Sequence, residues 1–260
     1  MPISNTLRLA GISKNGPNGT ETVRDPNLMQ KTLAEEWQPV FDAKYTDETE
    51  AENLLNSSKL PYFDPISDPN YFDHLRYSKT LKNKTPGTNM IPDVAWQVCP
   101  QIGIPTITAY SQHLFSGAPP HEGFNDSGIG FPPKGEKSLD AVEVFRSAKE
   151  TRPISLKNSD NKFIVGAAVR KLAPEAKTKT HESQRGFVSG RNFLNNVLDL
   201  DSIARILSMY YIHKGGDPNL DISKIPILAF FDFETAFPSV AHAWIRLVLR
   251  HRKVPQRQQF

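Results

Sequence analysis

Asp232 is the side chain of this sequence best placed to do chemistry. It directly follows an apolar run, residues 227–231, which is too short to indicate a helix and is typical of a strand buried on both faces. Such a strand shields its side chains from water until its C-terminal end, so a carboxylate there lies at the rim of a cleft. The alternative is a core strand whose Asp caps the turn that begins at Pro238 and Ser239. These residues alone leave both interpretations open.

Two cations, Lys134 and Arg152, accompany a predicted β-hairpin. Residues 128–136 and 141–156 are expected to form two strands joined by a polar loop, with Lys134 at the end of the first strand and Arg152 near the second. If the hairpin folds over a cleft, Arg152 can hold a triphosphate through its bidentate fork and Lys134 can act as a point charge. The alternative is an ordinary hairpin that carries solvated surface charges.

Further basic segments lie along the chain. Lys82 and Lys84 precede a turn at Pro86–Gly87, and this loop can present backbone N–H groups and lysines to a phosphate. Basic side chains outnumber acidic ones six to two in residues 170–191 and five to none in residues 246–257. Such clusters can contact a polyanion, although solvated helix faces are the alternative for each.

An α+β arrangement of elements would position these residues. Residues 1–28 are rich in Asn, Gly, Pro, Ser and Thr and indicate a flexible leader, whereas residues 29–80 carry helical periodicity. Helices are expected at residues 29–41, 46–55, 71–81, near 92, 103–116 and 159–172. A long helix after the Gly186–Gly190 turn carries an apolar stripe that we expect to be core. The stripe consists of Phe193, Val197, Leu200, Ile203 or Ala204, and Leu207.

The composition narrows the class of protein. With 260 residues and 38% hydrophobic content, the chain can bury one large core or two modest ones. Its net charge of +3 is too small to indicate a polyanion partner by itself. The single cysteine, Cys99, allows no internal disulfide and suits a reducing compartment. The sequence shows neither a signal peptide nor a membrane-spanning apolar run, so we expect a soluble intracellular protein, cytoplasmic or nuclear.

Five sequence blocks together resemble the reverse transcriptase domain of non-LTR (LINE-type) retrotransposons. They are KTPGTNMIP (84–92), FPPKGE (131–136), TRPISL (151–156), QRGFVSGR (184–191) and AFFDFETAFPSV (229–240). Any one block can recur by chance, whereas five in the family's order are specific. The resemblance implies a partial right-hand polymerase with a helix-rich N-terminal region. Residues 81–225 would form the fingers with a short β-hairpin, and residues 226–260 the first strand and helix of the palm.

In that family the enzyme is an RNA-directed DNA polymerase that acts on an RNA template, a DNA primer and deoxynucleoside triphosphates. Two Mg²⁺ ions held by carboxylates support the transfer of a nucleotide to the primer 3′-hydroxyl. The resemblance makes Asp232 the first catalytic, metal-binding aspartate and the Phe233 carbonyl a further ligand. Lys134 and Arg152 match positions that neutralise the triphosphate. Phe237 matches an aromatic that packs against the sugar and excludes a 2′-hydroxyl, with core packing as its alternative role.

The resemblance also assigns nucleic-acid contacts. Gln184, Arg185 and Arg191 would lie beside the template strand, and Lys82 and Lys84 would contact nucleic acid from the preceding loop. Contacts of this kind go to backbone phosphates, so they are independent of base sequence and sensitive to salt. We therefore expect general rather than sequence-specific binding.

The chain departs from the family in several places. Asn89 stands where relatives carry Asp, Met90 replaces their Gly, and Pro238 replaces a residue that is polar in many of them. Only 28 residues follow Asp232 (260 − 232), and they lack the paired aspartates of the family's second palm motif. Because one carboxylate cannot hold two metal ions, we predict that this chain alone does not polymerise DNA. We interpret it as a truncated product.

Two further classes are alternatives. The DFET block resembles the first motif of DEDD-type 3′-5′ exonucleases, in which Asp and Glu two residues apart bind metal. On a strand, Asp232 and Glu234 would share a face, but that fold needs acidic motifs downstream that the remaining residues do not supply. The other alternative is a non-catalytic nucleic-acid-binding fragment that keeps the basic surface of the fingers. It would bind RNA in a salt-dependent way without polymerase or nuclease activity.

Overall fold

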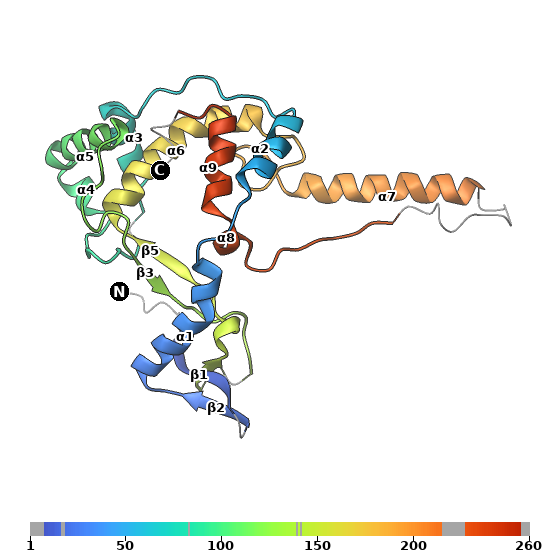
Figure 1. Ribbon diagram of the computed structural model, residues 1–260, viewed down its shortest axis with the longest axis horizontal. Coiled ribbons are helices and arrows are strands. Elements are labelled where there is room, and N and C mark those ends of the chain that lie inside the picture. Colours follow the sequence, from blue (N-terminus) through green and yellow to red (C-terminus); the bar gives the residue numbers. More distant parts are fainter. Residues whose placement is uncertain are drawn as a thin grey trace.

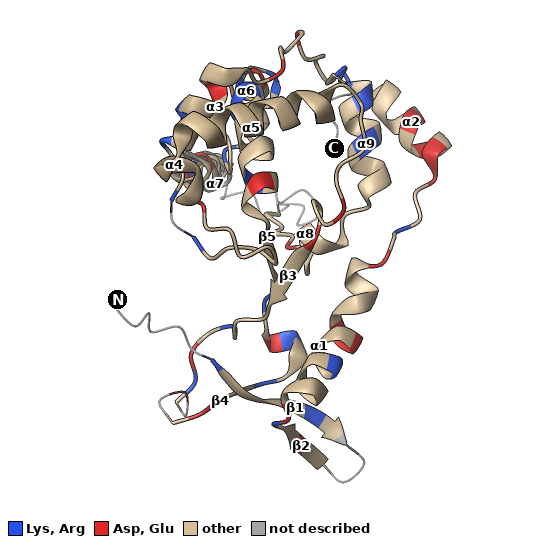
Figure 2. Cartoon of the chain, turned by 90° about the vertical axis from the view of Figure 1, so that its left-hand side faces the viewer, with Lys and Arg blue, Asp and Glu red and all other residues tan. Residues whose placement is uncertain are grey.

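Two small sheets and a layer of helices give the chain an α+β architecture. A three-stranded sheet and helix α1 (Pro26–Phe41) lie at one end and most of the other helices at the opposite end. A two-stranded ribbon of β3 (Ser127–Gly130) and β5 (Ile154–Lys157) lies between them (Figure 1, Figure 2). The computed structural model describes residues 8–16, 19–82, 84–138, 140, 142–214 and 227–255. None of the helices in these ranges has the length and apolar character needed to span a bilayer.

The N-terminal sheet corrects the prediction of a flexible leader over residues 1–28. Its strands are β1 (Leu9–Gly16), β2 (Gly19–Val23) and β4 (Val144–Arg146). β1 pairs antiparallel with β2 and parallel with β4, and Ile12 is fully buried against Leu33 and Ala148. Pairing with β4, which is distant in sequence, stabilises β1, and the polar local composition cannot reveal such a partner. Residues 1–7 of the predicted leader lie outside the described residues.

The helices of the first two thirds of the chain lie close to their predicted positions. They are α1, α2 (Glu48–Ser57), α3 (Tyr71–Ser78), α4 (Ala95–Val98), α5 (Pro100–Phe115) and α6 (Ser159–Lys179). Asp25, Asp47 and Asn70 cap the first three helices, because each side chain accepts a hydrogen bond from a backbone N–H of the first turn. Helix α3 begins at its predicted residue and α2 two residues later than predicted, whereas α1 begins at Pro26, within the predicted leader.

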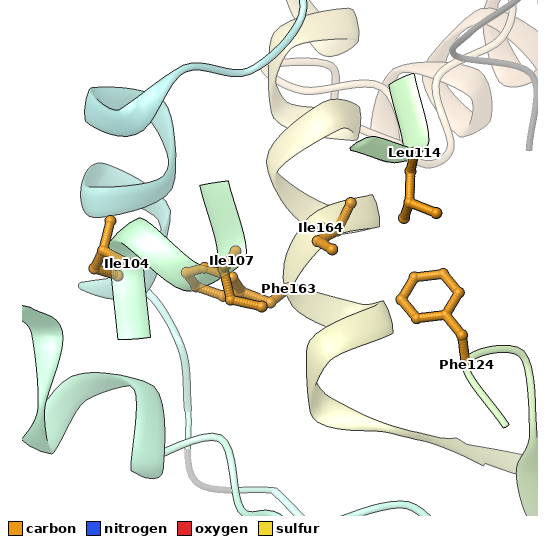
Figure 3. Close-up of a cluster of buried hydrophobic side chains, with 6 residues drawn as sticks. All are labelled: Ile104, Ile107, Leu114, Phe124, Phe163 and Ile164. Carbon is orange, nitrogen blue, oxygen red and sulfur yellow. The ribbon is translucent and has the colours of Figure 1, made fainter. Parts of the chain in front are cut away.

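The main core forms where α6 crosses α3 and α5. Its buried members are Ile104, Ile107, Leu114, Phe124, Phe163 and Ile164. Phe163 lies with the two isoleucines of α5, while its neighbour Ile164 faces Leu114 and Phe124 (Figure 3). Gly166 allows α3 to approach α6 closely, because a Cβ atom there would overlap the Tyr77 hydroxyl. α6 is therefore fixed on two sides.

The C-terminal helix α9 (His242–His251) lies within residues 226–260, for which a helix was expected. Its Leu247 is buried against Ala51 and Leu55 of α2, which lies far away in sequence. The neighbouring short helix α8 (Ala236–Ser239) contacts α1. This packing attaches the last part of the chain to its first helices.

The predicted hairpin is present, but its strands are shorter than expected. β3 pairs antiparallel with β5, and an isolated bridge between Pro133 and Thr151 continues the pairing. β4, which was predicted to belong to the second strand of this hairpin, joins β1 instead. Arg146 causes this departure in part, since its buried guanidinium pairs with Asp140 at 2.7 Å and 2.8 Å and folds the connection back on itself. A 3₁₀ turn, η1 (Ala148–Glu150), then leads to β5.

Helix α7 (Leu194–Lys214) projects away from the other helices (Figure 1). The stripe predicted to be core is exposed along it, in contrast to the expectation from periodicity. The exposed stripe residues are Phe193, Val197, Leu200, Ile203, Ala204 and Leu207. Periodicity shows that a helix has an apolar face but not which element covers that face. No described element packs over this one.

The segment before Asp232 corrects the prediction of a buried strand. Residues 227–233 form no strand, and their apolar side chains are exposed, with Phe231 at 88%. A strand requires a hydrogen-bonded neighbour, and within the described residues neither sheet includes this segment. Residues 215–226, which include the end of the predicted fingers and the first residue of the predicted palm, lie outside the described residues.

Candidate nucleic-acid interface

The loop of the first sequence block docks on the start of α6. Gly87 is buried there, and a Cβ atom at this position would lie 2.5 Å from the backbone N of Asn158. The Asn158 side-chain oxygen accepts hydrogen bonds from the Thr88 hydroxyl at 3.2 Å and the Asn89 backbone N–H at 3.1 Å. The Asn158 amide nitrogen donates to the Gly123 carbonyl at 3.1 Å. Asn158 therefore fixes the loop, a role that sequence reasoning missed.

Asn89 and Met90 form a turn in this loop. Met90 has a backbone φ of +58°, in the left-handed region that favours glycine. The Asn89 side chain accepts a hydrogen bond from the Ile91 N–H at 3.1 Å, as an aspartate would. Lys82 and Lys84 are both exposed just before the docked turn. The loop thus holds an exposed basic segment next to α6.

Lys134 and Arg152 flank the isolated bridge between Pro133 and Thr151, and each forms a backbone hydrogen bond across it. The Lys134 N–H donates to the Glu150 carbonyl at 2.7 Å, and the Arg152 N–H donates to the Pro132 carbonyl at 2.9 Å. The Lys134 ammonium donates to the Lys149 carbonyl at 2.8 Å. The Arg152 side chain is exposed and forms no salt bridge with a described residue.

A cavity of about 690 Å³ adjoins this hairpin. We call it the hairpin cavity, and it is bounded by the end of α1, β3, β5, α8 and the start of α9. Pro153, the neighbour of Arg152, and Phe237 both line it. Lys44, Lys157 and Arg246 supply three cations to its wall. A volume in this range is typical of sites for small ligands such as nucleotides.

Two exposed aromatic rings connect the last two sequence blocks. The Phe187 and Phe237 rings lie edge to face with centroids 6.1 Å apart. Phe187 is 98% exposed and Phe237 is 83% exposed, so neither ring is part of the core. Phe187 also has a backbone φ of +60°, which is unusual for a bulky residue. The exposure of Phe237 argues against the core-packing role that the sequence left open.

The predicted template residues have different environments. The Arg191 guanidinium donates to the backbone carbonyls of Lys177, Thr180, His181 and Gln184, so it holds the turn after α6. Arg185 pairs with Asp199 at 2.6 Å. Gln184 donates from its side chain to the Gly186 carbonyl at 3.0 Å. Contacts of these residues to nucleic acid stay a prediction.

Asp232 is exposed in the irregular segment 227–233. Within the described ranges, no three or more His, Cys, Asp or Glu side chains gather in a way that could hold a metal ion. Glu234 begins a turn in which Thr235 has a φ of +51°, so Asp232 and Glu234 do not share the face of a strand. Asp232 and the Phe233 carbonyl alone do not fit a pair of Mg²⁺ ions.

The site therefore consists of three cations, the carboxylate of Asp42 and the exposed ring of Phe237 around the hairpin cavity. No protein-family model matches the chain. Fixed cations next to exposed aromatic rings can bind phosphates and stack against bases. The geometry thus supports binding of a phosphorylated, base-containing ligand better than a metal-dependent reaction.

Proposed function

We propose that this chain corresponds to the fingers and the beginning of the palm of a non-LTR retrotransposon reverse transcriptase, and that it acts as a nucleic-acid-binding module. The observation that supports this best is that the five sequence blocks adjoin in space. The first block (84–92) docks on Asn158, just after the third block (151–156). The second block (131–136) pairs with the third, and the fourth (184–191) contacts the fifth (229–240) through two aromatic rings. Sequence blocks that matched the family by chance would not be expected to lie next to one another in the fold.

The hairpin cavity supplies the binding chemistry. Phe237, from the fifth block, and Pro153, from the third, line the same cavity as Lys44, Lys157 and Arg246. Cations at one wall attract phosphate groups, and an exposed ring offers a surface on which a base or sugar can pack. Because these contacts do not read base edges, the proposed binding is independent of sequence.

The proposal includes no polymerisation step for this chain. In the family, a pair of Mg²⁺ ions activates the primer hydroxyl and stabilises the leaving pyrophosphate. Asp232 alone does not hold such a pair, so the purified 260-residue chain is expected to give no primer extension on an RNA template above an Asp232→Ala control. Extension that depends on Asp232 would overturn this part of the proposal.

Binding of a fluorescein-labelled single-stranded RNA, followed by anisotropy at 50 mM salt, tests the function. The variant Lys44→Gln/Arg246→Gln removes two exposed cations that line the hairpin cavity and should weaken binding about tenfold or more. Lys59→Gln removes an exposed cation that does not line the cavity and should leave the affinity unchanged. Equal losses in both variants, or no RNA binding by the unaltered chain, would contradict the proposal.

A further inference from the structure

A second cavity lies between α3, α6 and the turn before Gly190, and it shares no residue with the hairpin cavity. We call it the α3–α6 pocket. Its volume is about 630 Å³. Lys and Arg residues occupy neighbouring parts of α3 and α6 (Figure 2). The polar side chains of its wall are Asp73, Arg76, Arg170, Lys171, Lys177 and Ser189.

The charges of this pocket do not balance. Asp73 is its one carboxylate, and it accepts hydrogen bonds from the Lys171 ammonium and from the Asn70 backbone N–H, each at 3.0 Å. Arg76, Arg170 and Lys177 form no salt bridge with any residue that the structure describes. Four cations against one carboxylate leave a net charge of +3 in the pocket.

The other cations near the end of α6 are engaged elsewhere. Lys179 pairs with Asp64 at 3.2 Å, and Arg185 pairs with Asp199. The Arg191 guanidinium is held by backbone carbonyls. The basic segment of residues 170–191 therefore divides into cations that hold the fold together and cations that converge on the pocket.

We propose that the α3–α6 pocket binds the terminal phosphate monoester of a nucleic-acid strand. A backbone phosphodiester carries one negative charge, whereas a monoester carries nearly two, which better matches the excess positive charge of the pocket. Arg76 and Arg170 can each donate two parallel hydrogen bonds to phosphate oxygens, and Lys177 can contribute a point charge. The Ser189 hydroxyl is a further donor. The volume leaves room for the terminal nucleoside.

The choice of a strand end rests on the proposed function, because a free mononucleotide offers the same phosphate chemistry. The test compares the binding of one RNA sequence in three forms, with a 5′-phosphate, with a 3′-phosphate and with hydroxyls at both ends. Adenosine monophosphate is titrated separately. A phosphate at one end should strengthen binding about tenfold.

The variant Arg170→Gln/Lys177→Gln should abolish the preference for the phosphorylated RNA while it retains most of the binding to the hydroxyl form. Lys79→Gln, which lies beyond Arg76 on the chain and outside the pocket, should keep the preference. The single variant Arg76→Gln repeats the test on another element, and thermal melts show that each variant is folded.

The outcomes separate this inference from the proposed function. Equal binding of all three RNA forms by the unaltered chain would overturn the pocket assignment and leave general RNA binding intact. Adenosine monophosphate that binds as tightly as the phosphorylated RNA would overturn the strand end as the ligand. If no RNA binds but adenosine monophosphate binds in a way that needs Arg170 and Lys177, the proposed function fails while the phosphate site stands.

Discussion

Met90 stores backbone strain that a single substitution can release. Its φ of +58° costs a residue with a side chain about 1–2 kcal/mol, and the side chain is 73% exposed, so little packing offsets that cost. Met90→Gly should raise the free energy of unfolding by about 0.5–1 kcal/mol, after the greater freedom of glycine in the unfolded chain is included. Urea denaturation measures the change. Met90→Ala keeps the strain and should give no gain, so an equal gain from both variants would contradict this explanation.

Asp140 makes the stability depend on acid pH. Hydrogen bonds from the Arg146 guanidinium and the Lys137 backbone N–H lower the pKa of Asp140 to about 2. In the unfolded chain the carboxyl titrates at about 3.9, so its stabilising effect is present above pH 4 and is lost as the pH falls towards 2. Lys137 and Ser147 likewise lower the pKa of Glu150 to about 2, and this group titrates over the same range.

Thermal melts of the unaltered chain and of Asp140→Asn between pH 2 and pH 5 test this prediction. The melting temperature of the unaltered chain should fall over that range. The fall should be smaller in the variant, because only Glu150 of the two carboxyls then remains to titrate. An identical fall in both proteins would show that the pair with Arg146 does not contribute.

At the scale of elements, the contact between Gly87 and the start of α6 is sensitive to side-chain volume. Gly87→Ala places a methyl group 2.5 Å from the Asn158 backbone and should destabilise the fold by about 2 kcal/mol or more. Gly128→Ala is the matched control, since its nearest neighbours would lie at 4.0 Å. Chemical denaturation of both variants measures the difference. An equal loss of stability in Gly128→Ala would mean that replacing a glycine is destabilising in general, and it would contradict the explanation by the docked loop.

The sequence predicted elements where local chemistry determines them. Asp47 and Asn70 cap α2 and α3 with their own side chains, and both helices begin within two residues of their predicted starts, whereas α1 begins inside the predicted leader. The strand predicted for residues 227–231 and the buried face of α7 depended on partners that a local pattern cannot name. β1 has a local antiparallel partner, β2, and a distant parallel partner, β4, and only the second is beyond the reach of a local pattern.

The candidate site was predictable to a similar degree. The hairpin beside Lys134 and Arg152 followed from its strand pattern, although its strands are shorter than predicted. Asn158 carries a local signal, because asparagine just before a helical run is a typical capping residue, but its side chain makes no cap hydrogen bond and binds the loop instead. The meeting of Phe187 with Phe237 had no such signal, since a contact between two loops depends on the whole fold.

At the scale of the whole molecule, two sets of cations face different cavities. The hairpin cavity carries Lys44, Lys157 and Arg246, and the α3–α6 pocket carries Arg76, Arg170 and Lys177 among others. The net charge of +3 conceals this division, because acidic residues elsewhere offset the total. We expect nucleic acid to be held by local clusters rather than by the overall charge of the chain.

The salt dependence of RNA binding tests the central claim most directly. If at least three of these cations contact phosphates of a single strand, a plot of log K against log salt concentration should have a slope of about −2 or steeper. The measurement is an anisotropy titration of one single-stranded RNA at salt concentrations from about 50 to about 200 mM. Over this range phosphate contacts change the affinity enough for the slope to be determined. No binding at the lowest salt, or a slope near zero, would contradict the account of this chain as a nucleic-acid-binding module.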